Sequence, residues 1–216
     1  MLINNSEFYE EKTGQLNNLK VRDITIQDAA EVANLHIEGI NTGFISSLGI
    51  DFVTALYEAI AQDTSSFGFV VEENDRTLGF VAFTEDLDKL YRAVIVKKGI
   101  RFILLLARGV FSLRRLKKIL ETLFYPARIK KANLPRAELL SIVIAEEQQG
   151  RGLATILMQK GLTECSRRKI EKVKVLVGAD NERANKLYLK CGFELVRQID
   201  NHGVLSNIYV RRTNLV

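Results

Sequence analysis

The sequence is poor in the residue types that build metal sites and disulfide frameworks. It has two cysteines and two histidines, and neither Cys165 nor Cys191 has a partner at a zinc-ligand spacing. A zinc site is therefore disfavoured, and no metal is expected. Both cysteines are predicted to be free thiols in a reducing compartment.

Several targeting and ligand-binding segments are also missing. The first residues, 1-MLINNSEFYEEKTGQLNN-18, lack the basic flank and apolar segment of a secretory signal, so a cytoplasmic protein is expected. No run of about 18 residues is free of charge, as a transmembrane helix requires. Neither the Gly-Lys-Ser/Thr ending of a P-loop nor the G-x-G-x-x-G of a dinucleotide turn is present.

The basic charge of the chain is confined to one segment. The net charge is +5, but residues 97–131 hold eleven Lys/Arg against the single acid Glu121, so this segment carries +10 and the remainder −5. Because the remainder is acidic and no recognition module is visible, a nucleic-acid partner is disfavoured.

Length and hydrophobic periodicity predict one α/β (α+β) domain. At 216 residues and 47% hydrophobic content, the chain can build one substantial core, expected over 20–212 after a polar, flexible lead-in at 1–19. Helical spacing of apolar residues predicts helices at 28–40 and 51–62, a helix after the glycines that ends near 168, and a short helix at 181–190. Strands are expected at 20–26, 67–73, 76–85, 137–144, 172–178, 193–199 and 204–212.

The order of these elements predicts the sheet. Antiparallel hairpins precede a β-α-β crossover, so the sheet should be mixed and mostly antiparallel, with helices on both faces. A long helical insertion is expected at about 87–133.

A glycine-containing turn is the first functional signal. The segment 147-EQQGRGLATILMQK-160 follows the apolar strand and opens a helix without a Ser, Thr or Asp at its N-cap. The unpaired N–H groups and the dipole of a helix N-terminus attract anions, and Gly150 and Gly152 would let a phosphate approach the backbone beside Arg151. A plain tight turn into a helix would explain the same residues equally well.

A second motif follows at 181-NERANKLYLKCGFE-194. Asp180 or Asn181 is expected to cap a short helix that Gly192 ends. Helix capping does not explain why Asn181 and Tyr188 stand two turns apart on one face.

Together, 142-IVIAEEQQGRGLAT-155 and 181-NERANKLYLKCGFE-194 resemble the GNAT superfamily of acyl-CoA-dependent N-acyltransferases. The resemblance implies a GNAT-like fold and acetyl-CoA as the acyl donor. The pantetheine arm would run along Ile142, Val143 and Ile144, and Asn181 would contact it. Tyr188 would face the thioester sulfur. The pyrophosphate would lie on the backbone of Gln149, Gly150, Arg151, Gly152, Leu153 and Ala154.

The chemistry implied by this resemblance needs an acid and a base. A phenol is protonated at neutral pH, so Tyr188 could protonate the departing thiolate. Many members of the family have a glutamate on the strand after the glycine-turn helix, where this sequence has Leu176. Glu138 is the substitute candidate, because strand alternation would place it on the face of Ile142 and Ile144; a solvated carboxylate at a strand end is the alternative.

Three residues are candidates for the acceptor pocket. His36 lies in 35-LHIEGINTGF-44, where the family often forms that pocket, and Phe44 and Tyr57 could line it. Each could equally be a capping or core residue.

The leading functional hypothesis is an N-acyltransferase acting on a primary amine of a small molecule, such as an amino sugar. The alternative is an inactive acyl-CoA-binding or membrane-associated module. The basic segment 97–131 could make a peripheral contact with an anionic membrane, attract an anionic substrate, or pack on the domain or a second subunit, which leaves a homodimer open.

Overall fold

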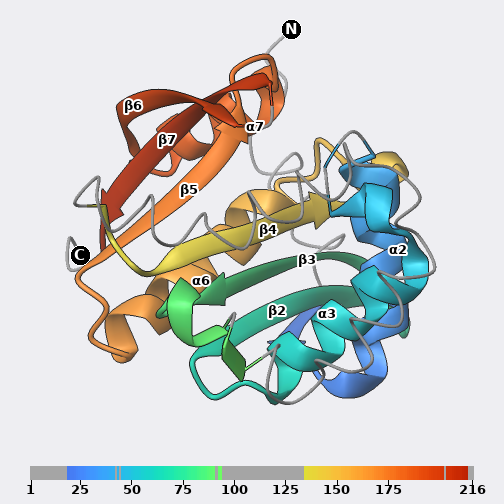
Figure 1. The fold of residues 1–216 in the computed structure, drawn as a ribbon. Coiled ribbons are helices and arrows are strands. Elements are labelled where there is room, and N and C mark those ends of the chain that lie inside the picture. The colour runs from blue at the N-terminus through green and yellow to red at the C-terminus, as the bar shows by residue number, and fades with distance from the viewer. Residues whose placement is uncertain are drawn as a thin grey trace, which may run out of the picture.

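The computed structural model describes residues 19–41, 43, 45–90, 92–93, 134–201 and 203–213. Seven strands form one sheet in the order β1-β2-β3-β4-β5-β7-β6 (Figure 1). The strands are β1 (Leu19–Asp23), β2 (Ser66–Glu73), β3 (Arg76–Thr84), β4 (Glu138–Ile144), β5 (Lys172–Gly178), β6 (Glu194–Asn201) and β7 (Val204–Arg212). The α-helices are α2 (Ala29–Gly39), α3 (Ile50–Gln62), α6 (Leu153–Arg167) and α7 (Glu182–Lys190), and short 3-10 helices cover Ile26–Asp28, Ser46–Leu48 and Glu146–Gln148.

The mixed, mostly antiparallel sheet that the sequence predicts is confirmed. Every neighbouring pair is antiparallel except β4 and β5. The observed elements agree with the expected ranges within one or two residues, except that β1 ends at Asp23, three residues before the expected end at 26, and a 3-10 helix begins at Ile26. The lead-in at 1–18 and the basic segment at 97–131 lie outside the described residues, so the predicted insertion and single-domain organisation stay predictions. Among the helices of the described ranges, none is long and apolar enough to cross a membrane.

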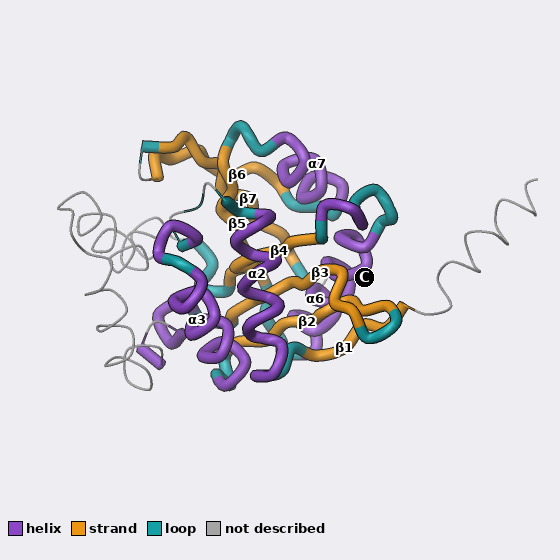
Figure 2. The backbone as a smooth tube through the Cα atoms, turned by 90° about the vertical axis from the view of Figure 1, so that its right-hand side faces the viewer, coloured by secondary structure: helices purple, strands orange, loops and turns teal. Residues whose placement is uncertain are grey.

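Helices α2 and α3 cover one face of the sheet (Figure 2). Buried positions recur at helical spacing in both helices, and they meet side chains from β2, β3 and β4 in one core. The core members include Ala29, Val32, Ala33, Val53, Tyr57, Ile60, Val70, Phe80, Ala82 and Val143.

Helices α6 and α7 pack on the opposite face. Their buried residues form a second core with the other side of β2 through β5 and with β7. Glycine at 161 permits the close contact of α6 with the sheet, because a Cβ there would lie 2.2 Å from the ring of Phe83.

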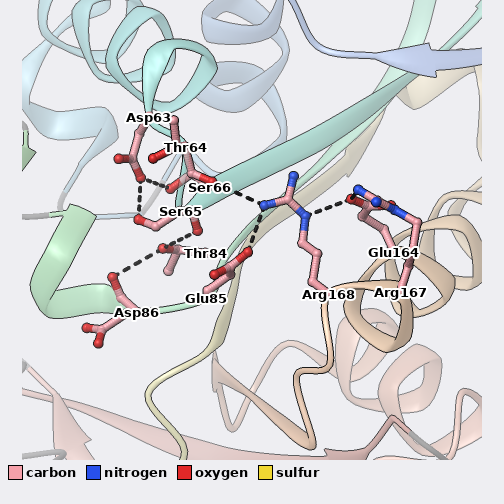
Figure 3. Close-up of polar contacts among 10 residues, drawn as sticks. All are labelled: Asp63, Thr64, Ser65, Ser66, Thr84, Glu85, Asp86, Glu164, Arg167 and Arg168. Atoms are coloured by element: carbon pink, nitrogen blue, oxygen red, sulfur yellow. Dashed lines mark hydrogen bonds and ion pairs between the residues drawn. The ribbon is translucent and has the colours of Figure 1, made fainter.

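A polar network fixes the C-terminal end of α6 (Figure 3). The guanidinium of Arg168 donates to Glu164 at 2.6 Å, to Glu85 at 2.8 Å and to the carbonyl of Thr64 at 3.2 Å. It also lies over the ring of Phe67, 4.5 Å from the centroid. These contacts tie the end of α6 to the ends of β2 and β3, so they contribute to fixing the direction in which its N-terminus points.

Strands β4 and β5 pair only at their beginnings. The parallel ladder joins Glu138 to Lys174 and Leu139 to Val175 and then stops, and the two strands diverge from that point (Figure 1). Residues 141–144 pair with β3 on one side and have no ladder partner on β5. One edge of β4 is thus left open toward the gap.

A bulge in β4 changes which residues share a face. Ser141 pairs with Ala82, but Leu139 pairs with Phe83, so Leu140 is an extra residue in β4. Leu139 therefore shares the α6 face with Ile142 and Ile144, and the expected common face of Glu138 with those isoleucines is wrong.

Candidate functional site

The glycine turn stands at the mouth of the gap between β4 and β5. Gly150 and Gly152 have φ of +83° and +82°, a backbone conformation that non-glycine residues rarely adopt. A Cβ built at either position would meet nothing within 4 Å. The glycines therefore satisfy the turn and leave the space above it open.

Helix α6 begins at this turn with an uncapped N-terminus. Its N-cap is Gly152, which has no side chain to bond to the first amides. Among the described residues, no acceptor is assigned to the main-chain amides from Gly150 to Ala154. A fifteen-residue helix thus presents its positive dipole end and several N–H donors to the open space. Leu153, at the first helical position, is buried and anchors the helix start in the core.

Arg151 does not extend freely over the turn. Its guanidinium pairs with both carboxylate oxygens of Glu73, at 2.8 and 3.3 Å, and this contact raises the pKa of Arg151 and lowers that of Glu73. An anion at the turn would compete with Glu73 for this cation.

A second arginine at the turn was not identified from the sequence. Arg183, in the first turn of α7, donates to the side chain of Gln149 at 2.6 Å, and Gln149 reaches back to the carbonyl of Ile144 at 3.4 Å. This contact joins the two sides of the gap, the α6 turn and the start of α7. Its only sequence signal was the N-E-R start of the second motif.

Asn181, one of the two residues expected to cap the short helix, is the N-cap of α7. Its side-chain oxygen accepts from the amide of Ala184 at 3.1 Å, and the residue is exposed. It does not share a buried face with Tyr188, because the buried residues of α7 are Asn185 and Tyr188. Its expected contact with a cofactor stays a prediction.

Tyr188 is buried, with 4% of its surface exposed. Its ring is tilted against Phe193 and Tyr209, with centroid separations of 5.7 and 6.0 Å. Burial raises the pKa of its hydroxyl, so the group stays protonated at neutral pH. An acid role for Tyr188 is compatible with this protonation state and is not tested by it.

Asn185 is the centre of a buried polar network that sequence reasoning missed. Its amide donates to the carbonyls of Gly178 and Asn181, at 2.9 and 2.7 Å. Its oxygen accepts from Asn207 and from the Tyr209 hydroxyl, both at 2.8 Å. The network fixes α7, and with it Tyr188, against the end of β5 and against β7.

Glu138 forms a buried ion pair at the point where β4 and β5 separate. Its carboxylate lies 2.9 Å from the ammonium of Lys174, which is fully buried and also donates to the carbonyl of Pro135 at 2.8 Å. Burial raises the pKa of Glu138, and Lys174 opposes that shift. The alternative of a solvated carboxylate is wrong; a base role stays a prediction.

His36 and Tyr57 are brought together beside β4. His36 Nδ1 lies 2.7 Å from the Tyr57 hydroxyl. Burial lowers the pKa of His36 to about 4 and raises that of Tyr57. The third pocket candidate, Phe44, lies outside the described residues.

These features define what the site can do. An elongated ligand with an anionic group fits the open amides of α6 at one end and the unpaired edge of β4 along its length, where free N–H and C=O groups can bind it. Neutral polar side chains lie on both sides of that edge. In the ranges that the structure describes, no cluster of His, Cys, Asp or Glu could hold a metal.

Comparisons with known proteins agree with this geometry. The model of the acetyltransferase (GNAT) family matches residues 113–193. No curated protein matches the chain in sequence.

Solved structures with the same fold come from several organisms. The ribosomal-protein-S18-alanine N-acetyltransferase from Escherichia coli superposes with a TM-score of 0.59 at 13% identity, covering 92% of this chain and 96% of that one. An acetyltransferase from Salmonella typhimurium, solved with acetyl-CoA, gives 0.60 at 15%, covering 93% and 96%. Arabidopsis thaliana NAA60 in complex with acetyl-CoA gives 0.58 at 16%, covering 91% and 99%.

Proposed function

We propose that the chain is a member of the GNAT superfamily of acetyl-CoA-dependent N-acetyltransferases, and that it transfers an acetyl or similar acyl group from CoA to a primary amine of a small molecule, such as an amino sugar. Membership favours the enzyme over the inactive acyl-CoA-binding module. The acceptor is the part of the function that needs an experiment.

One observation carries the assignment of the cofactor site. The open edge of β4 runs to Ile144, and the uncapped N-terminus of α6 follows in the chain at Leu153. A pyrophosphate would bind the amides from Gln149 to Ala154, with Arg151 and Arg183 as nearby cations. The pantetheine arm, which carries amide groups, would add main-chain hydrogen bonds along Ile142, Val143 and Ile144, and Asn181 would contact it from the start of α7.

The residues around this site would divide the chemistry between them. Bound acetyl-CoA supplies the activated acyl group. A main-chain amide near Ile144 would donate to the developing oxyanion. Tyr188, protonated at neutral pH, would give its proton to the departing thiolate. The amine must lose a proton as it attacks, and Glu138 is one proposed base.

A compact acceptor is supported by the packing of α2 on β4. A Cβ on Gly39 would lie 2.4 Å from a methyl group of Val143, so α2 approaches the strand closely where the acyl group would lie. This leaves less room for a large acceptor on that face.

The cofactor site is tested with a substitution that has a matched control. Gly150→Asp and Gly152→Asp each place a carboxylate in the proposed phosphate site, so calorimetric binding of acetyl-CoA should be lost. Gly203→Asp is the control, because Gly203 has the same φ of +82° and nothing within 4 Å but lies in the β6–β7 turn. Wild-type affinity in the Gly150 and Gly152 variants would refute the cofactor site.

The acceptor is tested by thiol release against a panel of amines. The panel holds hexosamines, a nucleotide-linked amino sugar, a diamine and a peptide with a free N-terminal alanine. Turnover of a small amine supports the proposal, and turnover of the peptide alone would replace the acceptor class while keeping the reaction. With the accepted amine, Tyr188→Phe should lower kcat by about 10²-fold and leave acetyl-CoA affinity unchanged.

A further inference from the structure

His36 has one ring nitrogen that no interaction of the fold explains. The residue is 5% exposed, and its Nδ1 is bound to Tyr57. Its Nε2 is buried and has no hydrogen-bond partner among the described residues. A buried polar atom without a partner destabilises the fold, and a ligand at Nε2 would relieve that cost.

The position of His36 relative to β4 is fixed by two contacts. The ring of Tyr57, which holds Nδ1, packs edge-on against Phe80, and Phe80 pairs with Val143 of β4. Gly39, one turn after His36 on α2, lies against Val143. The imidazole is therefore held beside residues 141–143, the segment of β4 whose other edge is open toward β5.

The hydrogen bonds also constrain the tautomer. His36 Nδ1 and the Tyr57 hydroxyl share one hydrogen bond, and the group that donates in it decides which ring nitrogen carries the hydrogen. If Nδ1–H donates to Tyr57, Nε2 carries a bare lone pair. The opposite arrangement would bury an N–H donor without an acceptor, which folded proteins avoid more strictly than a bare acceptor.

From this geometry we infer that Nε2 of His36 contacts the acceptor amine and takes its proton during acyl transfer, which makes His36 a catalytic base. The inference rests on the proposed function and adds a residue to it. It places the base on α2 and not on the strands that border the gap. Tyr57 is then a positioning residue, because it acts through His36.

Acyl transfer moves one proton from the amine to His36 and one from Tyr188 to the leaving sulfur. The nitrogen lone pair of the neutral amine forms the new C–N bond to the acyl carbon, and the carbonyl electrons move to oxygen. The nitrogen loses one hydrogen as a proton to Nε2. The electron pair on oxygen then re-forms the C=O bond while the C–S bond breaks, its electron pair leaves with sulfur, and Tyr188 protonates that sulfur. His36 and Tyr188 return to their starting states through solvent.

The weak basicity of His36 fits this step. Burial lowers its pKa to about 4, so above pH 5 the imidazole is neutral and its lone pair is available. A nitrogen becomes far more acidic as its bond to the acyl carbon forms, so a weak base can take the proton at that stage. Tyr57 of α3 is the polar group that holds the ring, and no charged group among the described residues adds to the shift.

Glu138 is the competing base, and its contacts make it less available. Its carboxylate is paired with Lys174, and it lies where β4 and β5 are still joined by the ladder. A base in that position would have to give up a buried ion pair to bind the amine, and disrupting such a pair is costly.

The kinetic test compares His36→Gln with Glu138→Gln. His36→Gln keeps a buried amide but removes the proton acceptor, so kcat/KM for the amine should fall by about 10² to 10³-fold with acetyl-CoA affinity unchanged. Glu31→Gln is the control on α2, because it weakens a polar contact to Thr77 of β3 that involves neither His36 nor Tyr57, and it should leave kcat/KM within about threefold. A wild-type kcat/KM in His36→Gln, or a loss confined to Glu138→Gln, would overturn the inference.

A second readout needs no turnover. The chain has only two histidines, so ¹⁵N NMR of the ring nitrogens with His36→Gln for assignment can report the tautomer of His36 in the unliganded protein. We expect Nδ1 protonated and Nε2 bare, and Tyr57→Phe should weaken that preference. A wild-type His36 protonated only at Nε2 would contradict the inference even if every variant were unstable. Acetyl-CoA binding by wild type, measured alongside, separates this failure from failure of the proposed function.

Discussion

The buried imidazole of His36 should make the stability of this protein fall on mild acidification. The pKa of His36 is lowered from 6.5 to about 4 by burial. Between these values the unfolded chain binds a proton and the folded chain does not, so the free energy of unfolding decreases as pH falls. The stabilisation is fully present above pH 6.5 and is lost through the window down to about pH 4.

The size of this effect follows from the shift. A shift of 2.5 pKa units, from 6.5 to about 4, corresponds to about 3 kcal/mol, of which about 2 kcal/mol is lost between pH 7 and pH 5. Carboxylates such as Asp28, whose pKa is lowered to about 2 by Arg22, lose their own contribution mainly at lower pH. His36 should therefore dominate the change in this window.

Urea unfolding followed by circular dichroism at pH 7, 6 and 5 measures the effect. The informative quantity is the difference between wild type and His36→Gln, because all other groups titrate in both proteins. Wild type should lose about 2 kcal/mol more than the variant between pH 7 and pH 5. Parallel curves for the two proteins would refute the burial argument for His36.

Two further predictions concern the buried polar groups of the gap, each measured by the same urea unfolding at pH 7. Asn185→Leu should lower the free energy of unfolding by about 1 to 3 kcal/mol for each of the two donors that lose their acceptor, Asn207 and the Tyr209 hydroxyl. The control Lys186→Ala, at an exposed position of the same helix, should change it by less than about 0.5 kcal/mol. Equal effects of the two substitutions would contradict the stabilising role of the Asn185 network. Lys174→Met should cost about 3 to 5 kcal/mol, because it leaves Glu138 buried without its partner; a loss below about 1 kcal/mol would show that the pair is more solvated than its burial indicates.

The cofactor end of the site could be predicted from local sequence. Positive φ at Gly150 and Gly152, the missing N-cap of α6 and the cap at Asn181 depend on residues a few positions apart. Local backbone preferences are strong enough to specify such features without long-range contacts. The mixed, mostly antiparallel character of the sheet followed from the succession of hairpins and one crossover.

Single residues in contact across the sheet could not be predicted in this way. Glu138 was placed on the wrong face because alternation in β4 fails at Leu140, where the ladder with β3 slips by one residue. The role of Asn185 was missed because its partners Asn207 and Tyr209 lie 22 and 24 positions further along the chain.

The sequence by itself determined the type and order of the elements and the glycine turn that opens α6, since each depends on periodicity or on a short motif. Only the tertiary structure decided which polar side chains meet: Glu138 with Lys174, Arg183 with Gln149, and His36 with Tyr57. The physical reason is that burial and partnership set the energy of a polar group, and both are properties of distant segments brought together by packing.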